Sequence, residues 1–201
     1  AFVLWKLLRN PREEKILVVS ASGVKAREFV SQVKSILMTM DILAHLRPRP
    51  DQRDMVDRFD VNGASLSQSP SMKAAGITGQ ITGSRATTII PDDIEITENS
   101  KTEEARMNLL RAVNEFDAIL IPGNKSQVVF LGTPQTEELI YLRLIKERGF
   151  NCFCFPARYP RMDKRASYEI QRENGQVHDI LAPPLRVLDR HPELEWKPTD
   201  P

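Results

Sequence analysis

Apolar runs without alternation constrain the fold of this chain more than any other feature of its sequence. Ile16–Val19 and Val128–Leu131 are apolar throughout. A strand with one face in water alternates apolar and polar side chains, whereas a strand buried on both faces of a parallel sheet does not. Runs at Ala86–Ile90 and 151–155 bring the expected buried strands to at least four. These runs predict an α/β fold with a mostly parallel sheet flanked by helices.

Helical periodicity fills much of the chain between these strands. Apolar side chains recur at helical spacing over residues 1–9, 24–46, 102–115 and 137–148. Strand, small turn and helix make βα units, and ligands of such sheets bind at the carboxyl ends of the strands. Ser20 and Ser22, in the turn after the first strand, are therefore expected at the edge of a ligand site.

Charge and composition limit the classes of partner. The chain has 28 Lys and Arg against 27 Asp and Glu, a net charge of +1, so only local basic patches can bind a polyanion. No apolar run approaches the ~20 residues that a membrane-spanning helix needs, and no membrane partner is expected. Cys152 and Cys154 are interpreted as buried thiols of a reducing compartment.

The composition changes beyond Pro160, where polar residues and prolines accumulate. Such a segment is typical of a linker or a peripheral arm. We therefore expect residues 1–160 to form one domain and residues 161–201 to form an arm. The chain also begins within a helical pattern and without a capping residue, which suggests a piece cut from a longer protein.

Adjacent carboxylates follow the predicted strand at Ala86–Ile90. Asp92, Asp93 and Glu95 would put negative charge at the carboxyl edge of the sheet, where a divalent cation offsets their repulsion. In phosphoanhydride hydrolysis one such carboxylate holds Mg²⁺ and its neighbour orients the attacking water. The alternative is that the two aspartates only cap the following turn. The residues alone leave both interpretations open.

Two further features fit nucleotide chemistry. Arg85 follows Gly79 and Gly83, and an arginine on such a loop can reach a γ-phosphate; the alternative is an ion pair with the nearby acids. Gly132, Thr133 and Pro134 follow a buried strand, where a hydroxyl can sense the phosphate state or simply belong to an ordinary loop. Together these signals describe a RecA-like core of the ASCE P-loop NTPase class. Its phosphate loop, G-x-x-x-x-G-K-[ST], is absent from the sequence.

Six short runs, in one order, give the sequence a family resemblance. The chain resembles the large terminase subunit of tailed phages, the ATP-driven DNA-packaging motor, and most closely the type of the short-tailed autographiviruses. The runs are ILVVSAS (16–22), RPRPDQRD (47–54), GITGQITGSRA (76–86), DDIEI (92–96), LGTPQTE (131–137) and PARYP (156–160). The six runs together are far more specific than any one of them.

The resemblance implies a role for each candidate residue. Asp92 would manage Mg²⁺ in a Walker B element, and Asp93 would stand where the family more often has a catalytic Glu, which leaves Glu95 as a rival. Arg85 matches an arginine that reaches the nucleotide of a neighbouring subunit. Gly132–Pro134 match a motif that couples hydrolysis to movement, and Ser20 and Ser22 match the segment after the strand that follows the phosphate loop.

The resemblance also implies what lies outside the chain. The phosphate loop and the adenine-contacting segment would lie upstream of Ala1, because residues 1–5 resemble the helix after that loop. A nuclease domain would follow near Pro201. The chain would thus be an ATP hydrolase core that lacks part of its nucleotide site, and alone it is expected to be inactive. Its cofactors would be ATP and Mg²⁺.

A packaging motor grips DNA by its phosphates without reading sequence. The implied partners are double-stranded DNA, the portal protein, the small terminase subunit and further copies in a ring, in the cytoplasm of an infected bacterium. The candidate DNA contacts form two basic clusters, although each can equally be a solvated surface. They are Arg47, Arg49 and Arg53 in the first cluster and Arg158, Arg161, Lys164 and Arg165 in the second.

Two other functions stay open at this point. Asp92, Asp93 and Glu95 could form a metal-dependent nuclease site, which would cleave DNA without ATP. Alternatively, the chain could be a degenerate assembly module that has lost its phosphate loop.

Overall fold

The computed structural model describes residues 1–79, 81, 83–123, 126–133, 140–151, 170–171 and 177–178. It divides into two compact units, Ala1–Leu139 and Ile140–Pro201. The described part of the second unit holds helix α6 (Ile140–Arg148) and a two-stranded antiparallel sheet of β6 (Ile170–Gln171) and β7 (Val177–His178). The predicted strand at 151–155, both cysteines and the expected boundary at 160/161 lie outside the described residues, apart from Asn151.

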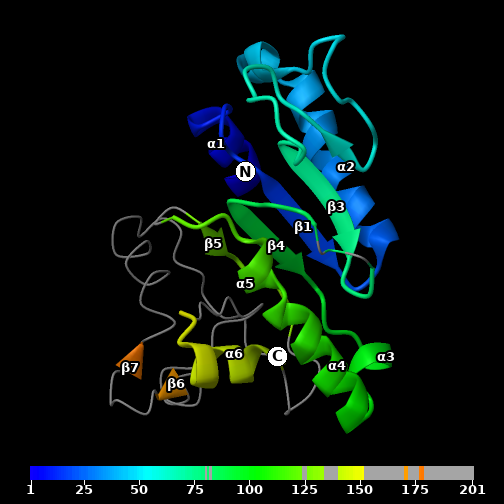
Figure 1. Ribbon diagram of the computed structural model, residues 1–201, viewed down its shortest axis with the longest axis vertical. Helices are drawn as coiled ribbons and strands as arrows, with labels where there is room; N and C mark the ends of the chain where they lie inside the picture. The colour runs from blue at the N-terminus through cyan, green and yellow to red at the C-terminus, as the bar shows by residue number, and fades with distance from the viewer. Residues whose placement is uncertain are drawn as a thin grey trace, which may run out of the picture. The chain divides into compact units, whose positions relative to one another are not determined.

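A five-stranded sheet in the order β2-β3-β1-β4-β5 organises the first unit (Figure 1). All neighbouring strands are parallel except β2, which runs antiparallel to β3 at one edge. The predicted α/β fold with a mostly parallel sheet is confirmed. The strands are β1 (Ile16–Ser20), β2 (Arg58–Phe59), β3 (Met72–Gly76), β4 (Thr88–Asp92) and β5 (Gln127–Val128).

Strand β1 occupies the centre of the sheet, and all five of its residues are buried. This burial on both faces is what its unalternating sequence predicted. Ile16 and Val18 belong to a core cluster with Val30, Val33 and Leu37 of helix α2 (Gly23–Thr39). Helix α1 (Phe2–Arg9) adds Val3, Leu4 and Leu7 to the same core.

Predicted strand and helix ends shift by a few residues. Strand β4 begins at Thr88 rather than Ala86, and β5 is only two residues long, although its pairing with β4 continues as far as Leu131. The helix predicted over 102–115 corresponds to α4 (Glu103–Asn114). It begins directly after Thr102, because the Thr102 side chain accepts a hydrogen bond from the Ala105 N–H and caps the helix. Short helices α3 (Thr97–Ser100) and α5 (Phe116–Ile119) flank it.

The single helix predicted over 24–46 was wrong in its second half. Helix α2 ends at Thr39, Met40 is extended, and a 3₁₀ helix, η1 (Asp41–Leu46), follows. The break lets Leu43 and Leu46 enter the core, where they are 5% and 2% exposed. The Arg47 side chain stabilises the break by donating to the carbonyls of Leu37 and Met40.

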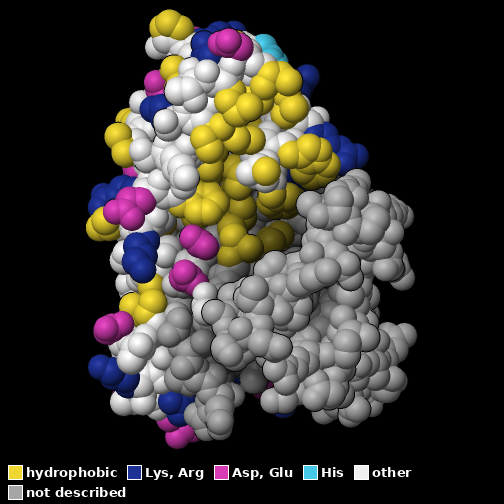
Figure 2. All heavy atoms as spheres, turned by 180° about the vertical axis from the view of Figure 1, so that it is seen from behind, with side chains coloured by type: hydrophobic (Ala, Val, Ile, Leu, Met, Phe, Trp, Pro, Cys, Tyr) yellow, Lys and Arg dark blue, Asp and Glu magenta, His cyan; other side chains and the backbone are white. Residues whose placement is uncertain are grey.

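Part of the surface of the first unit is apolar. Figure 2 shows hydrophobic side chains gathered on one side of this unit. Helix α1 exposes Phe2, Trp5 and Leu8 on the side away from its buried residues. Phe2 stacks on Trp5 with ring centroids 6.1 Å apart, and the Arg9 guanidinium lies 5.3 Å from the Trp5 centroid. Among the described helices, none is long and apolar enough to cross a membrane.

The end of β3 and the start of α2 approach each other closely at two glycines. A Cβ on Gly76 would lie 2.8 Å from the Gly23 nitrogen, too close to fit without moving backbone, whereas a Cβ on Gly23 would meet Gly76 at an ordinary 3.7 Å. We expect Gly76→Ala to lower the free energy of unfolding by about 1–3 kcal/mol. Gly23→Ala is the matched control and should be neutral or slightly stabilising, because alanine favours helix. Urea denaturation of both variants measures this, and equal effects would contradict the packing argument.

Candidate functional site at the carboxyl edge of the sheet

Three neighbouring strands end at one edge of the sheet and bring candidate residues together there. Ser20 at the end of β1 is in register with Asp92 at the end of β4. Asp92 also pairs with Leu131, which precedes Gly132 and Thr133. The structure therefore joins Ser20, Asp92 and the Gly132–Thr133 segment, as expected for the carboxyl edge of a parallel sheet. Pro134 lies outside the described residues.

Asp92 is the half-buried carboxylate of this edge. Burial raises its pKa above the ordinary value, the adjacent Asp93 carboxylate raises the pKa further, and Lys25 opposes both effects. The edge therefore carries more negative charge than its own residues neutralise. Such a carboxylate has the electrostatic character of a cation ligand.

Asp93 is held in an uncommon backbone conformation. Its φ angle is +44°, a left-handed value that few residues other than glycine, asparagine and aspartate adopt readily. Its N–H donates to the Leu131 carbonyl at 3.0 Å, which ties the turn to the end of β5. The Asp93 residue is exposed. The turn thus presents its carboxylate to water beside Asp92.

Glu95, the rival carboxylate, lies in a different environment. It is 2% exposed and contacts other parts of the chain. After Glu95 the chain enters α3, where Asn99 closes the turn by accepting from the Ile96 N–H and donating to the Ile94 carbonyl. Burial separates Glu95 from the water-accessible edge, so the structure favours Asp93 for any role that needs contact with water.

The start of α2 adds a residue that the sequence analysis missed. Ser22 caps the helix by accepting a hydrogen bond from the Lys25 N–H at 3.3 Å. The positive charge of Lys25 acts on Asp92 and lowers its pKa, against the two larger effects. Lys25 could have been found from its place in the first turn after a predicted site strand. The edge therefore combines two aspartates, two serines and one lysine.

The perturbed Asp92 makes stability depend on pH. A folded-state pKa above the unfolded value of about 3.9 means that this group stabilises the fold fully at pH below that value and loses the contribution as pH rises through the folded-state pKa. We expect Asp92→Asn to remove this loss, so the variant gains stability relative to the wild type from acid to neutral pH. Urea denaturation across that range measures the difference. A difference independent of pH would contradict the assigned environment.

Arg85 lies at the opposite end of the sheet from Asp92. It precedes β4, whose last residue is Asp92, and strands rise by about 3.3 Å per residue. Its Nη1 donates to the Ala118 carbonyl at 2.6 Å, and its N–H donates to the Ser69 hydroxyl at 3.0 Å. The structure therefore does not bring Arg85 to the Asp92 edge of its own chain. The ion pair considered as an alternative for Arg85 is not formed within the described residues.

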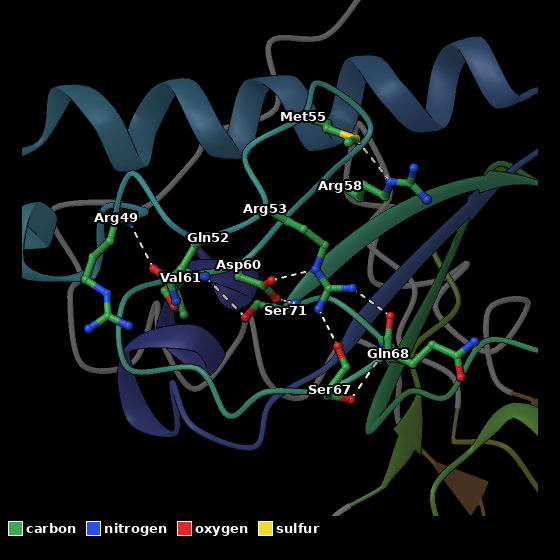
Figure 3. Close-up of polar contacts among 11 residues, drawn as sticks. Arg49, Gln52, Arg53, Met55, Arg58, Asp60, Val61, Ser67, Gln68 and Ser71 are labelled. Carbon is green, nitrogen blue, oxygen red and sulfur yellow. Dashed lines mark hydrogen bonds and ion pairs between the residues drawn. The ribbon is translucent and has the colours of Figure 1, made fainter.

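The first basic cluster is largely used by the fold itself. Arg53 donates to the Asp60 carboxylate at 2.7 Å, to the Gln68 carbonyl at 2.7 Å and to the Ser67 carbonyl at 2.5 Å (Figure 3). Arg47 is occupied at the end of α2. Arg49 is the most exposed of the three arginines, with a side chain 58% exposed and 3.4 Å from Asp51.

The second basic cluster belongs to the C-terminal part of the sequence. Arg158, Arg161, Lys164 and Arg165 lie outside the described residues. Among the described residues, Arg49 is therefore the one predicted DNA contact whose side chain is mostly exposed.

The carboxyl edge fits a magnesium ion held together with a phosphate ligand. No group of three or more His, Cys, Asp or Glu side chains is arranged to share a metal in the described part of the chain. Mg²⁺ usually needs no such group, since it is held by one or two carboxylates together with water and substrate phosphates. A half-buried aspartate with a raised pKa, beside an exposed one, matches that pattern.

Comparison with known proteins gives one match across the whole chain. No family model matches the sequence. The chain is 45% identical over 203 aligned residues to the large terminase subunit of Enterobacteria phage T3. The alignment includes all of this chain but only 33% of the length of that relative.

Proposed function

The chain is related along its whole length to a large terminase subunit of an autographivirus, and from this premise we propose that it is part of the ATPase core of a viral DNA-packaging motor. In this proposal ATP hydrolysis drives double-stranded DNA into a procapsid, in the cytoplasm of an infected bacterium. The partners are the portal protein, the small terminase subunit and further copies in a ring.

The observation that carries the proposal is the acidic carboxyl edge of the sheet. Asp92 lies between the ends of β1 and β5, next to Ser20 and Leu131. Asp92 would hold Mg²⁺, which would neutralise phosphate charge when bound together with ATP. Asp93, exposed beside it, would accept a proton from the attacking water. The Gly132–Thr133 segment follows the neighbouring strand and would respond to the phosphate state of the nucleotide.

Arg85 is proposed to act on the nucleotide of a neighbouring subunit. Its place before β4, at the opposite end from Asp92, supports action in trans rather than within one chain. An arginine supplied in trans can stabilise the charge of the transition state. Its hydrogen bond to the Ala118 carbonyl leaves its other guanidinium donors available for that contact.

The nuclease alternative gains less support from the same edge. A two-metal nuclease site needs several carboxylates that converge on a metal pair. Glu95 is buried while Asp93 is exposed, and the described residues contain no converging group of three ligands.

The test is ATP hydrolysis by the complete gene product, compared with this 201-residue chain. We expect Mg²⁺-dependent turnover by the complete protein and none by the chain, which has no phosphate loop sequence to hold the β- and γ-phosphates. Asp92→Ala should abolish turnover. DNA cleavage without ATP that Asp92→Ala removes would support the nuclease instead. An inactive complete protein would support the assembly module.

A further inference from the structure

A cavity of about 1210 Å³ opens at the amino edge of the sheet, opposite the Asp92 edge. Its lining includes residues that precede or begin three of the parallel strands: Lys15 before β1, Thr87 before β4 and Gln127 at the start of β5. All its lining residues belong to the first unit. Of the residues given a role in the proposed function, Arg85 lines this cavity and the residues of the carboxyl edge do not.

The charged residues that line this amino-edge cavity are mostly cationic. It includes Lys6, Arg9, Arg12, Lys15 and Arg85, against Glu13 and Glu14.

One of these two acids is already used within the fold. Glu14 is 5% exposed and accepts hydrogen bonds from the Thr87 and Thr88 hydroxyls at 2.8 and 2.6 Å. It also pairs with Lys6 at 3.4 Å. The cavity therefore keeps an excess of positive charge that the described residues do not neutralise.

Lys15 is the most unusual member of the lining. It is 4% exposed, and its Nζ has no hydrogen-bond partner among the described residues. Burial lowers its pKa; attraction to Asp60 opposes this effect, and repulsion from Arg53 adds to it. The Asp60 carboxylate is committed to Arg53 and to the Ser71 N–H. A buried ammonium without a hydrogen-bonded partner costs free energy, and an anionic ligand would offset that cost.

Other hydrogen-bond donors line the same cavity. Arg12 is exposed, and its carbonyl accepts from the Ser65 N–H at 2.9 Å, which ties two segments of the lining together. Ser69 accepts from the Arg85 N–H and keeps its own hydroxyl proton to donate. Several cations and hydroxyls suit a ligand with many oxygen atoms, such as a phosphate group, better than a single carboxylate.

We propose that the amino-edge cavity is a binding site for phosphate groups, with the exposed Arg12 as a direct ligand and the buried Lys15 supplying positive charge behind the lining. Phosphates reach such a site either on a small ligand, such as a nucleotide, or on the backbone of DNA. The site is separate from the carboxyl edge and does not depend on ATP hydrolysis there.

The experiment measures binding of pyrophosphate by calorimetry and of a short DNA duplex by fluorescence anisotropy, both to the 201-residue chain. We expect Arg12→Gln to weaken binding by about tenfold, the loss typical of one charged hydrogen bond. Lys15→Met should weaken binding by a smaller factor, because the buried Lys15 acts through its charge and not through a direct hydrogen bond. For the duplex, Arg12→Gln should also reduce the salt dependence by about one counterion. Loss confined to pyrophosphate identifies a small phosphate ligand, loss confined to the duplex identifies the DNA backbone, and loss of both probes identifies a phosphate site that accepts either source.

The control is Arg111→Gln, on α4, whose guanidinium donates to Asn108 and does not line the cavity. It should bind both probes as the wild type does. Urea denaturation separates binding from folding, since Lys15→Met should be at least as stable as the wild type and Arg12 is exposed. The proposal is overturned if neither probe binds, if both cavity variants bind normally, or if the control loses as much.

Discussion

Asp93→Asn in the complete gene product is expected to lower ATP turnover by about 100- to 10,000-fold, the range for losing a general base. Nucleotide affinity should change little, because Asp92 and the rest of the carboxyl edge remain. Asparagine tolerates the left-handed backbone at φ +44°, so the turn after β4 should keep its shape. Steady-state hydrolysis and equilibrium nucleotide binding measure the two effects separately.

Two matched variants make the Asp93 result interpretable. Asp51→Asn changes an aspartate whose side chain is 72% exposed and far along the chain from β4, and it should leave turnover unchanged. Glu95→Gln tests the rival carboxylate. If Glu95→Gln stops turnover while Asp93→Asn does not, the catalytic carboxylate is the buried one and the present assignment is wrong.

Asp60→Ala is expected to lower the free energy of unfolding by about 3–5 kcal/mol, as for breaking a buried ion pair from one side. The Asp60 side chain is 10% exposed and accepts from the Arg53 Nε at 2.7 Å and from the Ser71 N–H at 2.9 Å. Its removal leaves a half-buried guanidinium and a buried N–H without their partner. Urea denaturation at neutral pH measures the loss.

The control for this second prediction is the ion pair between Lys34 and Asp54, whose carboxylate side chain is 46% exposed. Asp54→Ala should cost no more than about 1 kcal/mol, as is usual for exposed pairs. Equal losses in the two variants would show that the Asp60 network stabilises the fold no more than an exposed ion pair does. The comparison also matters for DNA binding, because substitution of Arg53 removes the same ion pair. An Arg53 variant could therefore lose DNA binding through lower stability, even if Arg53 does not contact DNA.

The strands and the acidic edge could be predicted from the sequence because both depend on residues that are close together along the chain. A strand covered on both faces must be apolar throughout, and residues 16–19 of β1 satisfy this condition and are buried. The apolar run at 128–131 pairs with β4 at the edge of the sheet, where residues 128–130 are half-buried and Leu131 is 43% exposed, so its predicted burial on both faces was wrong. Asp92 and Asp93 follow their strand directly, so the direction of β4 alone places them at its carboxyl end. The family resemblance rested on the same short stretches, and the match to the phage T3 relative confirms it.

Only the tertiary structure decided which groups the charged side chains contact, because those groups lie far along the chain. Arg85 contacts Ala118, Lys15 lies near Asp60, and Arg53 joins a network that reaches Ser71. An arginine or lysine has the same local sequence signal whether it binds a ligand, supports a loop or is buried without a partner. Burial and hydrogen bonding are set by packing of distant segments, so the sequence determined the sheet and its acidic edge, while the fold decided which cations are free to act.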